Sequence, residues 1–330
     1  PEDLELIKKI INKFNANINF SWLEVLNLQK IDNEIFKINK KYKRNIGSNI
    51  CEGQKLWGRA KKIIPGGNML LSKRSELFLP EGWPVYYSKT SGCTVWDISN
   101  KEYIDMSLMG VGTNILGYSN REVDMKVSET ISLGNMSSLN CPEEVFLAEK
   151  LVKMHPWAEM VRFARTGGEA NAIAIRIARA ATGRDKVAIC GYHGWHDWYL
   201  ATNLKSENSL DEHLLPGLSP NGVPNSLSGT VIPFSYNDLD SLKEIVKNNN
   251  LAAIKMEVER STPPTSGFLE GVRELCLKNG IVLIFDECTS GFRETFGGIH
   301  LKYGVNPDMS MFGKALGNGY AITAVIGKSN

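Results

Sequence analysis

The fold of this chain is decided by the stretch Ile281-Val282-Leu283-Ile284-Phe285-Asp286-Glu287-Cys288, together with Met309-Ser310-Met311-Phe312-Gly313-Lys314 further on. Each stretch is a short apolar run that ends at a charged residue or a glycine. Such runs predict strands that are buried on both faces, as in parallel sheets. Asp286 and Lys314 then follow two strands of one sheet.

Strands and helices alternate along the chain from about residue 160. Strands are predicted at 160–164, 186–190, 230–234, 252–258, 281–285, 309–312 and 321–327. Helical patterns separate several of them, at 169–182, 238–248 and 267–279. This alternation predicts an α/β fold, with a mostly parallel sheet and helices on both faces. Functional sites of such sheets lie at the carboxyl ends of the strands.

The residues before 160 are organised differently. Helices are predicted at 1–14, 22–28, 31–42, 52–64, 121–133 and 142–154, and a hairpin at 94–97 and 102–106. We therefore predict three parts. Residues 1–50 form a helical tail or linker, residues 51–120 a small-domain segment, and residues 121–330 a large domain.

The composition excludes several classes of function. Hydrophobic residues make up 42% and charged residues 22% of the chain, as in ordinary globular proteins. The 38 basic and 36 acidic residues nearly cancel, which gives no reason to expect a nucleic-acid partner. No apolar run reaches the roughly 20 residues that cross a bilayer. The six cysteines show no paired spacing, so we expect neither a metal site nor disulfides, and a cytoplasmic location.

Asp286 and Lys314 are the candidate catalytic residues. A carboxylate after four apolar residues is costly to bury unless it meets a cation. A lysine in a glycine-flanked loop at a strand end is placed for covalent catalysis. Pyridoxal phosphate (PLP) enzymes need both groups, because a lysine amine holds the cofactor and an anion keeps its pyridine nitrogen protonated. Glu287 is expected to form a local salt bridge, with Arg293 as the candidate partner.

Three further motifs follow predicted strands. Thr166-Gly167-Gly168 opens a helix, which suits either a phosphate cradle or an ordinary tight turn. Tyr192 could stack on a planar ring, and the adjacent His193, His196 and Asp197 lack a second cluster that would complete a metal site. Glu257 could meet a substrate amine or pair locally at its strand end.

Taken together, these stretches resemble the class III PLP-dependent aminotransferases of fold type I, and most of all the glutamate-1-semialdehyde 2,1-aminomutase subgroup. The similarity runs in order over residues 55–328. It includes Ile64-Pro65-Gly66-Gly67, Val95-Trp96-Asp97, Thr166-Gly167-Gly168-Glu169-Ala170, Tyr192-His193-Gly194, Phe285-Asp286-Glu287, Gly291-Phe292-Arg293 and Phe312-Gly313-Lys314.

The resemblance implies a role for each site residue. Lys314 would hold PLP, Asp286 would pair with the ring nitrogen, and Tyr192 would stack on the ring. The phosphate would be met by Thr166, Gly167 and Gly168. The family fold also has a C-terminal domain, which this chain is expected to lack, and the full-length protein is expected to form a homodimer.

The chain departs from the family pattern at several positions. Gly168 stands where the family has Ser or Thr, which removes one hydroxyl contact to the phosphate. Cys288 replaces the small β-branched residue that packs on the other face of the ring. The aminomutase arginine for the substrate carboxylate has an altered context here, with Arg74 as the candidate in the segment 68–74. These changes favour an aminotransferase that acts on another carbonyl compound.

Residues 1–45 resemble a different family, the cytidylyltransferases of the spore-coat polysaccharide and CMP-acylneuraminate type, at their C-terminal end. This similarity implies a fusion between a sugar-activating enzyme and an aminotransferase. We therefore predict transfer of an amino group from a small-molecule donor to an aldehyde or ketone, with surface-glycan sugar biosynthesis as the setting. Two alternatives stay open: the intramolecular aminomutase reaction, and a homologue that binds PLP without turnover.

Overall fold

The computed structural model describes residues 2–15, 19–38, 51–134, 136–206, 209–210, 219–259 and 261–329. The chain divides into two compact units. Unit 1 comprises Pro1–Lys89 and Val95–Tyr103, and unit 2 comprises Thr90–Thr94 and Ile104–Asn330. Among the described residues, no helix is long and apolar enough to span a membrane.

Unit 1 is mostly helical, with α1 (Glu2–Lys13), α2 (Trp22–Ile31) and α3 (Glu52–Ile63), and short 3₁₀ helices at Ile35–Lys37, Leu71–Lys73 and Ser75–Leu77. Helix α2 begins at Ser21, whose side chain accepts from Glu24 N–H in a capping box. Helix α3 buries Trp57 and Ala60 on one face. The predicted helices at 1–14, 22–28 and 52–64 are confirmed, with residue 1 outside the described residues. The helix predicted at 31–42 is wrong in its described part, where α2 ends at Ile31 and only the 3₁₀ helix Ile35–Lys37 follows. Residues 39–42 lie outside the described residues.

Residues 87–104 form a small sheet of β1 (Tyr87–Ser91), β2 (Thr94–Asp97) and β3 (Glu102–Ile104), in that order. The predicted hairpin of β2 and β3 is confirmed, and β1 was not predicted. Asp97 holds the turn between β2 and β3, because its carboxylate accepts the N–H groups of Ser99 and Lys101.

The large sheet of unit 2 has seven strands in the order β4-β10-β9-β8-β7-β5-β6. The strands are β4 (Met160–Ala164), β5 (Lys186–Cys190), β6 (Val231–Pro233), β7 (Leu251–Glu257), β8 (Val282–Asp286), β9 (Met309–Phe312) and β10 (Thr323–Gly327). Strand β10 is antiparallel to both of its neighbours, and the pairs from β9 to β6 are parallel. The predicted mostly parallel sheet is confirmed.

The helices of unit 2 are α4 (Met109–Gly112), α5 (Arg121–Leu133), α6 (Pro142–Met154), α7 (Gly167–Thr182), α8 (Asp197–Leu200), α9 (Leu239–Asn248), α10 (Phe268–Asn279) and α11 (His300–Tyr303), with 3₁₀ helices at Ala201–Leu204, Asn225–Leu227 and Lys314–Gly317. All five helices predicted here are confirmed within two residues.

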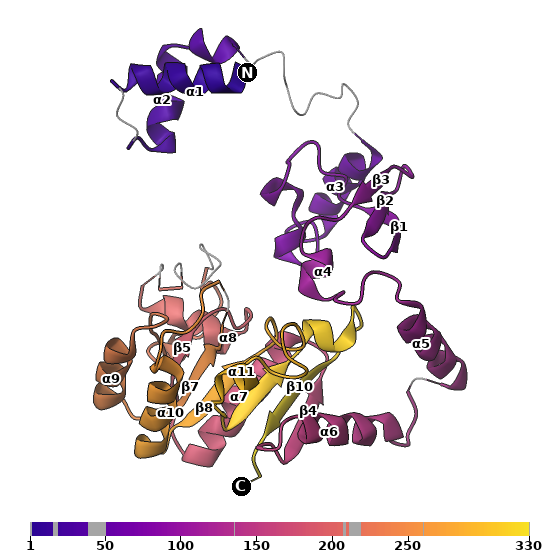
Figure 1. Cartoon of the computed structure of the whole chain (residues 1–330), viewed down its shortest axis with the longest axis vertical. Coiled ribbons are helices and arrows are strands. Elements are labelled where there is room, and N and C mark those ends of the chain that lie inside the picture. The colour runs from indigo at the N-terminus through magenta and orange to yellow at the C-terminus, as the bar shows by residue number, and fades with distance from the viewer. Residues whose placement is uncertain are drawn as a thin grey trace. The chain divides into compact units, whose positions relative to one another are not determined.

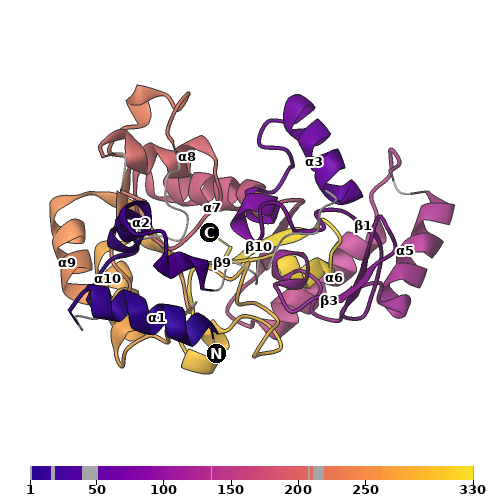
Figure 2. The same cartoon turned by 90° about the horizontal axis from the view of Figure 1, so that it is seen from above.

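Helices cover both faces of the large sheet (Figures 1 and 2). Residues of α9 and α10 pack on one face with Leu283 and Phe285 of β8. Residues of α7 and α8 pack on the other face with Ile284. Alternate residues of a strand point to opposite faces, so this separation into two cores follows from the strand geometry. It also places Asp286 on the same face as Ile284, beneath α7.

The strands β4, β5, β7, β8 and β9 run in one direction, so their carboxyl ends meet at one edge of the sheet. The residues predicted from sequence to form the site follow these ends, at Thr166, Tyr192, Glu257, Asp286 and Lys314. The topology therefore gathers at one edge groups that lie far apart in the sequence.

Candidate active site

Lys314 lies directly after β9, in the loop that begins with Gly313. Its backbone is left-handed, with φ of 45°. A non-glycine residue seldom adopts this conformation, so the surrounding structure must hold it. The Nζ atom donates a hydrogen bond to Thr289 Oγ1 at 2.9 Å. Lys314 thus points toward the loop that follows the neighbouring strand β8.

Asp286 ends β8 and is almost fully buried. Its Oδ2 atom accepts from His193 Nδ1 at 2.8 Å and lies 3.3 Å from Lys255 Nζ. Its Oδ1 atom accepts from Cys288 N–H at 3.1 Å. Burial alone would raise the pKa of Asp286, but Lys255 and His193 together hold this pKa well below its usual range. The site therefore contains a buried, ionised carboxylate.

His193 follows β5 and is buried beneath Asp286. Burial and the nearby charge of Lys255 lower the pKa of His193 to about 4, although Asp286 acts in the opposite direction. The imidazole is therefore neutral at pH 7 and has one N–H to donate. The carboxylate is a stronger acceptor than the Cys190 carbonyl oxygen, 3.1 Å from Nε2, so we assign the proton to Nδ1.

Lys255, like His193, is a contact of Asp286 that the sequence analysis did not predict. It lies in β7 with no exposed surface, and Nζ is also 3.0 Å from Met311 Sδ. A usable signal was present, because Lys255 interrupts an apolar run that was itself predicted to be a strand. A lysine in such a strand is buried and needs an anion beside it.

The first turn of α7 follows β4 and borders the site. Thr166 is the N-cap, and its Oγ1 accepts from Glu169 N–H while the Glu169 carboxylate accepts from Thr166 N–H. The Thr166 hydroxyl is thus engaged in capping the helix. Gly167 and Gly168 are the next residues, and N–H groups in a first turn have no partner within the helix. An anion would meet these two N–H groups and the helix dipole.

His196 lies against Gly168. A Cβ atom added at Gly168 would come within 2.8 Å of His196 Nε2. Real side chains do not approach this closely, so the Ser or Thr of the family pattern would require the imidazole to move. Glycine therefore fits at position 168 because the His196 imidazole occupies the space that a side chain would need.

Tyr192 follows β5 and Cys288 follows β8, and their contacts with a ring stay a prediction. The N–H of Tyr192 donates to the Glu257 carboxylate at 3.2 Å, so Glu257 anchors this turn. Cys288 Sγ lies 3.7 Å and 3.3 Å from the positions that a Cβ would take on Gly167 and on Gly313. The loops after β4, β8 and β9 therefore converge on this thiol. Burial and the Asp286 carboxylate raise the pKa of Cys288, which keeps it neutral.

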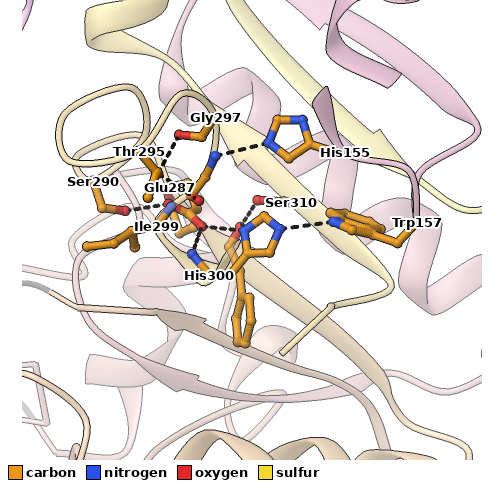
Figure 3. A network of polar contacts seen from close by, with 12 residues as sticks. His155, Trp157, Glu287, Ser290, Thr295, Gly297, Ile299, His300 and Ser310 are labelled. Carbon is orange, nitrogen blue, oxygen red and sulfur yellow. Dashed lines mark hydrogen bonds and ion pairs between the residues drawn. The ribbon is translucent and has the colours of Figure 1, made fainter. Parts of the chain in front are cut away.

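The buried carboxylate of Glu287 holds the loop after β8 in place (Figure 3). It accepts from His300 Nδ1 at 2.6 Å, from the N–H groups of Ile299 and His300, and from Ser290 Oγ. His300 Nε2 in turn accepts from Trp157 Nε1 at 2.9 Å. All four acceptor positions of the carboxylate are thus filled. This network fixes the segment that carries Cys288 and Thr289.

The prediction that Glu287 pairs with Arg293 is wrong. Arg293 instead donates to the carbonyl oxygens of Thr289 and Gly112. Glu287 points into the core, where backbone N–H groups and His300 satisfy it, whereas Arg293 is exposed. The order of residues along a loop does not show which of them turn inward.

The structure brings together eight of the nine residues predicted to form the site, all in unit 2. They are Thr166, Gly167, Gly168, Tyr192, Glu257, Asp286, Cys288 and Lys314. Arg74 belongs to unit 1, where its Nε donates to the Leu71 carbonyl oxygen, and its role in substrate binding stays a prediction. Within the described ranges, no three His, Cys, Asp or Glu side chains are grouped as metal ligands.

The residues present fit the cofactor that the sequence predicts. A carboxylate has about four acceptor positions. Lys255 and His193 meet Oδ2 of Asp286, and the Cys288 N–H meets Oδ1. The Cys288 thiol also lies within hydrogen-bonding reach of this carboxylate. Because the carboxylate is ionised, a pyridinium N–H is a donor that it can accept. An amine for covalent attachment and a helix N-terminus for a phosphate border the same strand ends.

Comparison with known proteins agrees with this arrangement. Residues 80–330 match the family model for aminotransferase class-III. A 3-aminobutyryl-CoA aminotransferase of Cloacimonas acidaminovorans is 38% identical over 291 residues, which cover 84% of this chain and 65% of that protein. A glutamate-1-semialdehyde 2,1-aminomutase of Methanobrevibacter smithii is 35% identical over 281 residues, covering 83% and 63%.

A similar solved structure is that of an omega-transaminase from Sphaerobacter thermophilus, with a TM-score of 0.72 and 28% identity over 84% of this chain and 64% of that one. The chain spans less than two thirds of the length of these relatives. The sheet has the predicted fold type I architecture. The family match covers most of the chain, and the chain therefore belongs to the class III aminotransferases.

Proposed function

We propose that the protein is a PLP-dependent aminotransferase. The observation that carries the proposal is the pair of groups at adjacent strand ends, the buried Asp286 carboxylate after β8 and the Lys314 amine after β9. The loop between them connects the two, because Cys288 N–H binds Asp286 and Thr289 binds Lys314. Class III aminotransferases use PLP, which is the cofactor that needs these two groups.

The bound cofactor would supply an electron sink for cleavage of a bond at the substrate carbon. The residues of this chain bind and orient it. Lys314 Nζ provides the covalent attachment and, once released, takes and returns the proton at the substrate carbon. Asp286 would accept the N–H of the pyridine ring. Tyr192 and Cys288 would border the two faces of the ring, and the N–H groups of Gly167 and Gly168 would bind the phosphate.

The amino acceptor in this proposal is an aldehyde or a ketone, and the donor is a small amine. The relatives include an aminotransferase and an aminomutase, which supports amino transfer of both kinds. Glu257 and Arg74 are the proposed substrate contacts. Glu257 lies at the end of β7, directly opposite Asp286 in the register of the sheet. The aminomutase reaction is the second candidate, because a relative with that name matches most of this chain.

The proposed setting is the biosynthesis of an amino sugar of a surface glycan. Its support is the resemblance of residues 1–45 to cytidylyltransferases, and residues 39–45 lie outside the described residues. The three-part domain division and the cytoplasmic location belong to the same proposal.

The proposal includes a homodimer. Apolar side chains between residues 125 and 146 are more than half exposed in unit 2. They are Met125, Ile131, Leu133, Met136, Leu139, Val145 and Phe146. Apolar surface of this extent is typical of an interface between protein chains. Sedimentation of the purified full-length protein tests the proposed homodimer, and a monomer at micromolar concentration would contradict it.

Mixing the PLP-loaded protein with single amino donors tests the function. We expect at least one donor to release its keto product in an amount equal to the number of sites, with conversion of PLP to pyridoxamine phosphate. The Lys314→Ala variant is the control and should release none. If a broad panel of amines yields no product from the loaded wild-type protein, the proposed function is wrong.

The same assay separates the two candidate reactions. An aminotransferase without an acceptor stops after one equivalent of product per site, and added ketone or aldehyde restarts it. An aminomutase moves the amino group within one molecule, so it turns over repeatedly with a single substrate. Repeated turnover of glutamate 1-semialdehyde without a second substrate would favour the aminomutase.

A further inference from the structure

Lys255 is a buried cation to which the proposed reaction assigns no role. Its side chain is fully buried in the middle of the large sheet. Its register partners Ile189 and Ile284 belong to the apolar core beneath α7. Taking an ammonium group out of water costs several kcal/mol, whereas an apolar residue here would cost nothing of that kind. The Asp286 carboxylate beside Lys255 offsets this cost, so the two buried charges act as a pair.

The position of Lys255 is defined by the register of two strands. Glu257 of β7 lies opposite Asp286 of β8, and Lys255 is two residues before Glu257 on the same face. Its ammonium group reaches diagonally across to Asp286 Oδ2, where the distance is 3.3 Å. Lys255 thus approaches the carboxylate from inside the sheet, on the oxygen that also binds His193. The ring nitrogen of a bound cofactor would approach the other oxygen.

We propose that Lys255 weakens the hold of Asp286 on the ring nitrogen and so lowers the affinity of that nitrogen for a proton. This inference rests on the proposed function. One carboxylate would serve two cations, and a fixed positive charge disfavours a second positive charge nearby in a site of low dielectric constant. Lys255 is in this sense a positioning residue, since it acts through Asp286 and not on the substrate.

The other groups around Asp286 do not replace this effect. His193 is neutral at pH 7, and the Cys288 thiol is neutral as well. Glu257 is held by the N–H of Tyr192, and Lys314 by Thr289. A comparison that changes only residue 255 leaves these four groups in place, so it isolates the contribution of the Lys255 charge.

Two ligands distinguish an effect on the ring nitrogen from a general effect on the site. One is PLP, and the other is its carbocyclic analogue, in which C–H replaces the ring nitrogen. The dissociation constants of both are measured for wild type and Lys255→Met at pH 8.5, where an imidazole stays neutral. Methionine has the length of the lysine stem and no charge. We expect PLP to bind at least about tenfold more tightly to the variant, because the positive charge beside Asp286 Oδ2 is then removed. The analogue should bind equally to both proteins.

Lys186→Met is the matched control. It also removes a lysine charge, but at the first residue of β5, where Lys186 binds Asn249. It should leave both dissociation constants unchanged. If Lys255→Met does not fold, Lys255→Gln serves instead, because its amide still donates to Asp286 Oδ2. The inference would be overturned if Lys255→Met changed the dissociation constants of PLP and of the analogue equally, or changed neither. Failure of the wild-type protein to bind PLP would refute the proposed function itself, which is a different result.

Discussion

The conformation of Lys314 is the most informative feature at the scale of single residues. Lys314 is not a glycine, yet its backbone is left-handed, so neighbouring contacts must offset the conformational strain. The hydrogen bond to Thr289 and the short loop after β9 supply such contacts. Strained residues of this kind cluster at functional sites, because the strain directs a side chain to a place that relaxed backbone would not reach.

Lys314→Ala should abolish covalent attachment of PLP and reduce turnover by at least about a thousandfold, since the attached amine and the proton carrier are lost together. Borohydride reduction, digestion and mass spectrometry check this by locating the pyridoxyl group on the peptide that contains Lys314. Lys302→Ala is the control, because Lys302 is exposed and pairs with Glu294. A pyridoxyl group on any other lysine would contradict the assignment.

At the scale of secondary-structure elements, the site depends on contacts between turns. The first turn of α7 leaves room for His196 only because residue 168 is glycine. The loop after β8 is positioned by Glu287, which ties it to α11 and, through His300, to Trp157. Neither contact is between residues adjacent in sequence. Both determine where the ends of strands lie in relation to one another.

Gly168→Ser should lower the free energy of unfolding by about 1 kcal/mol, because the new side chain displaces the His196 imidazole. In a His196→Ala background the same substitution should cost less, since the space is then empty. Urea unfolding of the two single variants and the double variant measures this coupling. The same cost in both backgrounds would show that His196 does not constrain residue 168.

Glu287→Gln should destabilise the loop after β8 by about 2–4 kcal/mol. An amide nitrogen cannot accept, so at least one of the buried donors around residue 287 loses its acceptor. Hydrogen exchange of residues 287–300 should speed up, and covalent PLP attachment should weaken. Glu294→Gln is the matched control in the same loop, where the exposed pair with Lys302 contributes at most about 1 kcal/mol. If hydrogen exchange of the loop were equally slow in Glu287→Gln and Glu294→Gln, the role of Glu287 would be contradicted.

At the scale of the whole molecule, the buried titratable groups link stability of unit 2 to pH. The pKa of His193 is about 4 in the folded protein against an ordinary 6.5. Burial also lowers the pKa of His155. The unfolded chain therefore binds more protons than the folded protein between pH 6.5 and pH 4. Stability is lost as the pH falls through this range, and Asp286 extends the loss below its ordinary pKa.

We expect the free energy of unfolding to fall by about 3 kcal/mol between pH 6.5 and pH 4 on account of His193 alone. Urea unfolding at half-unit steps of pH measures the slope. His193→Gln should flatten it, because glutamine does not titrate and its amide can still donate to Asp286. A variant with the slope of the wild type would show that His193 does not titrate as the geometry indicates.

Local patterns of the sequence predicted most helices and strands, the mostly parallel sheet and the edge at which the predicted site residues lie, although they did not predict β1. Apolar runs of strand length and helical periodicity are local signals, and parallel strands bring their carboxyl ends together. Residues such as Lys314 and Asp286 follow those ends directly, so their placement could be predicted.

Which side chains meet depends on the folded chain. Lys255 pairs with Asp286 because β7 and β8 are adjacent in a particular register, and Glu287 binds His300 because the loop between them folds back. Such contacts depend on the side to which a residue turns and on the strand beside it, which the local pattern of a sequence does not specify.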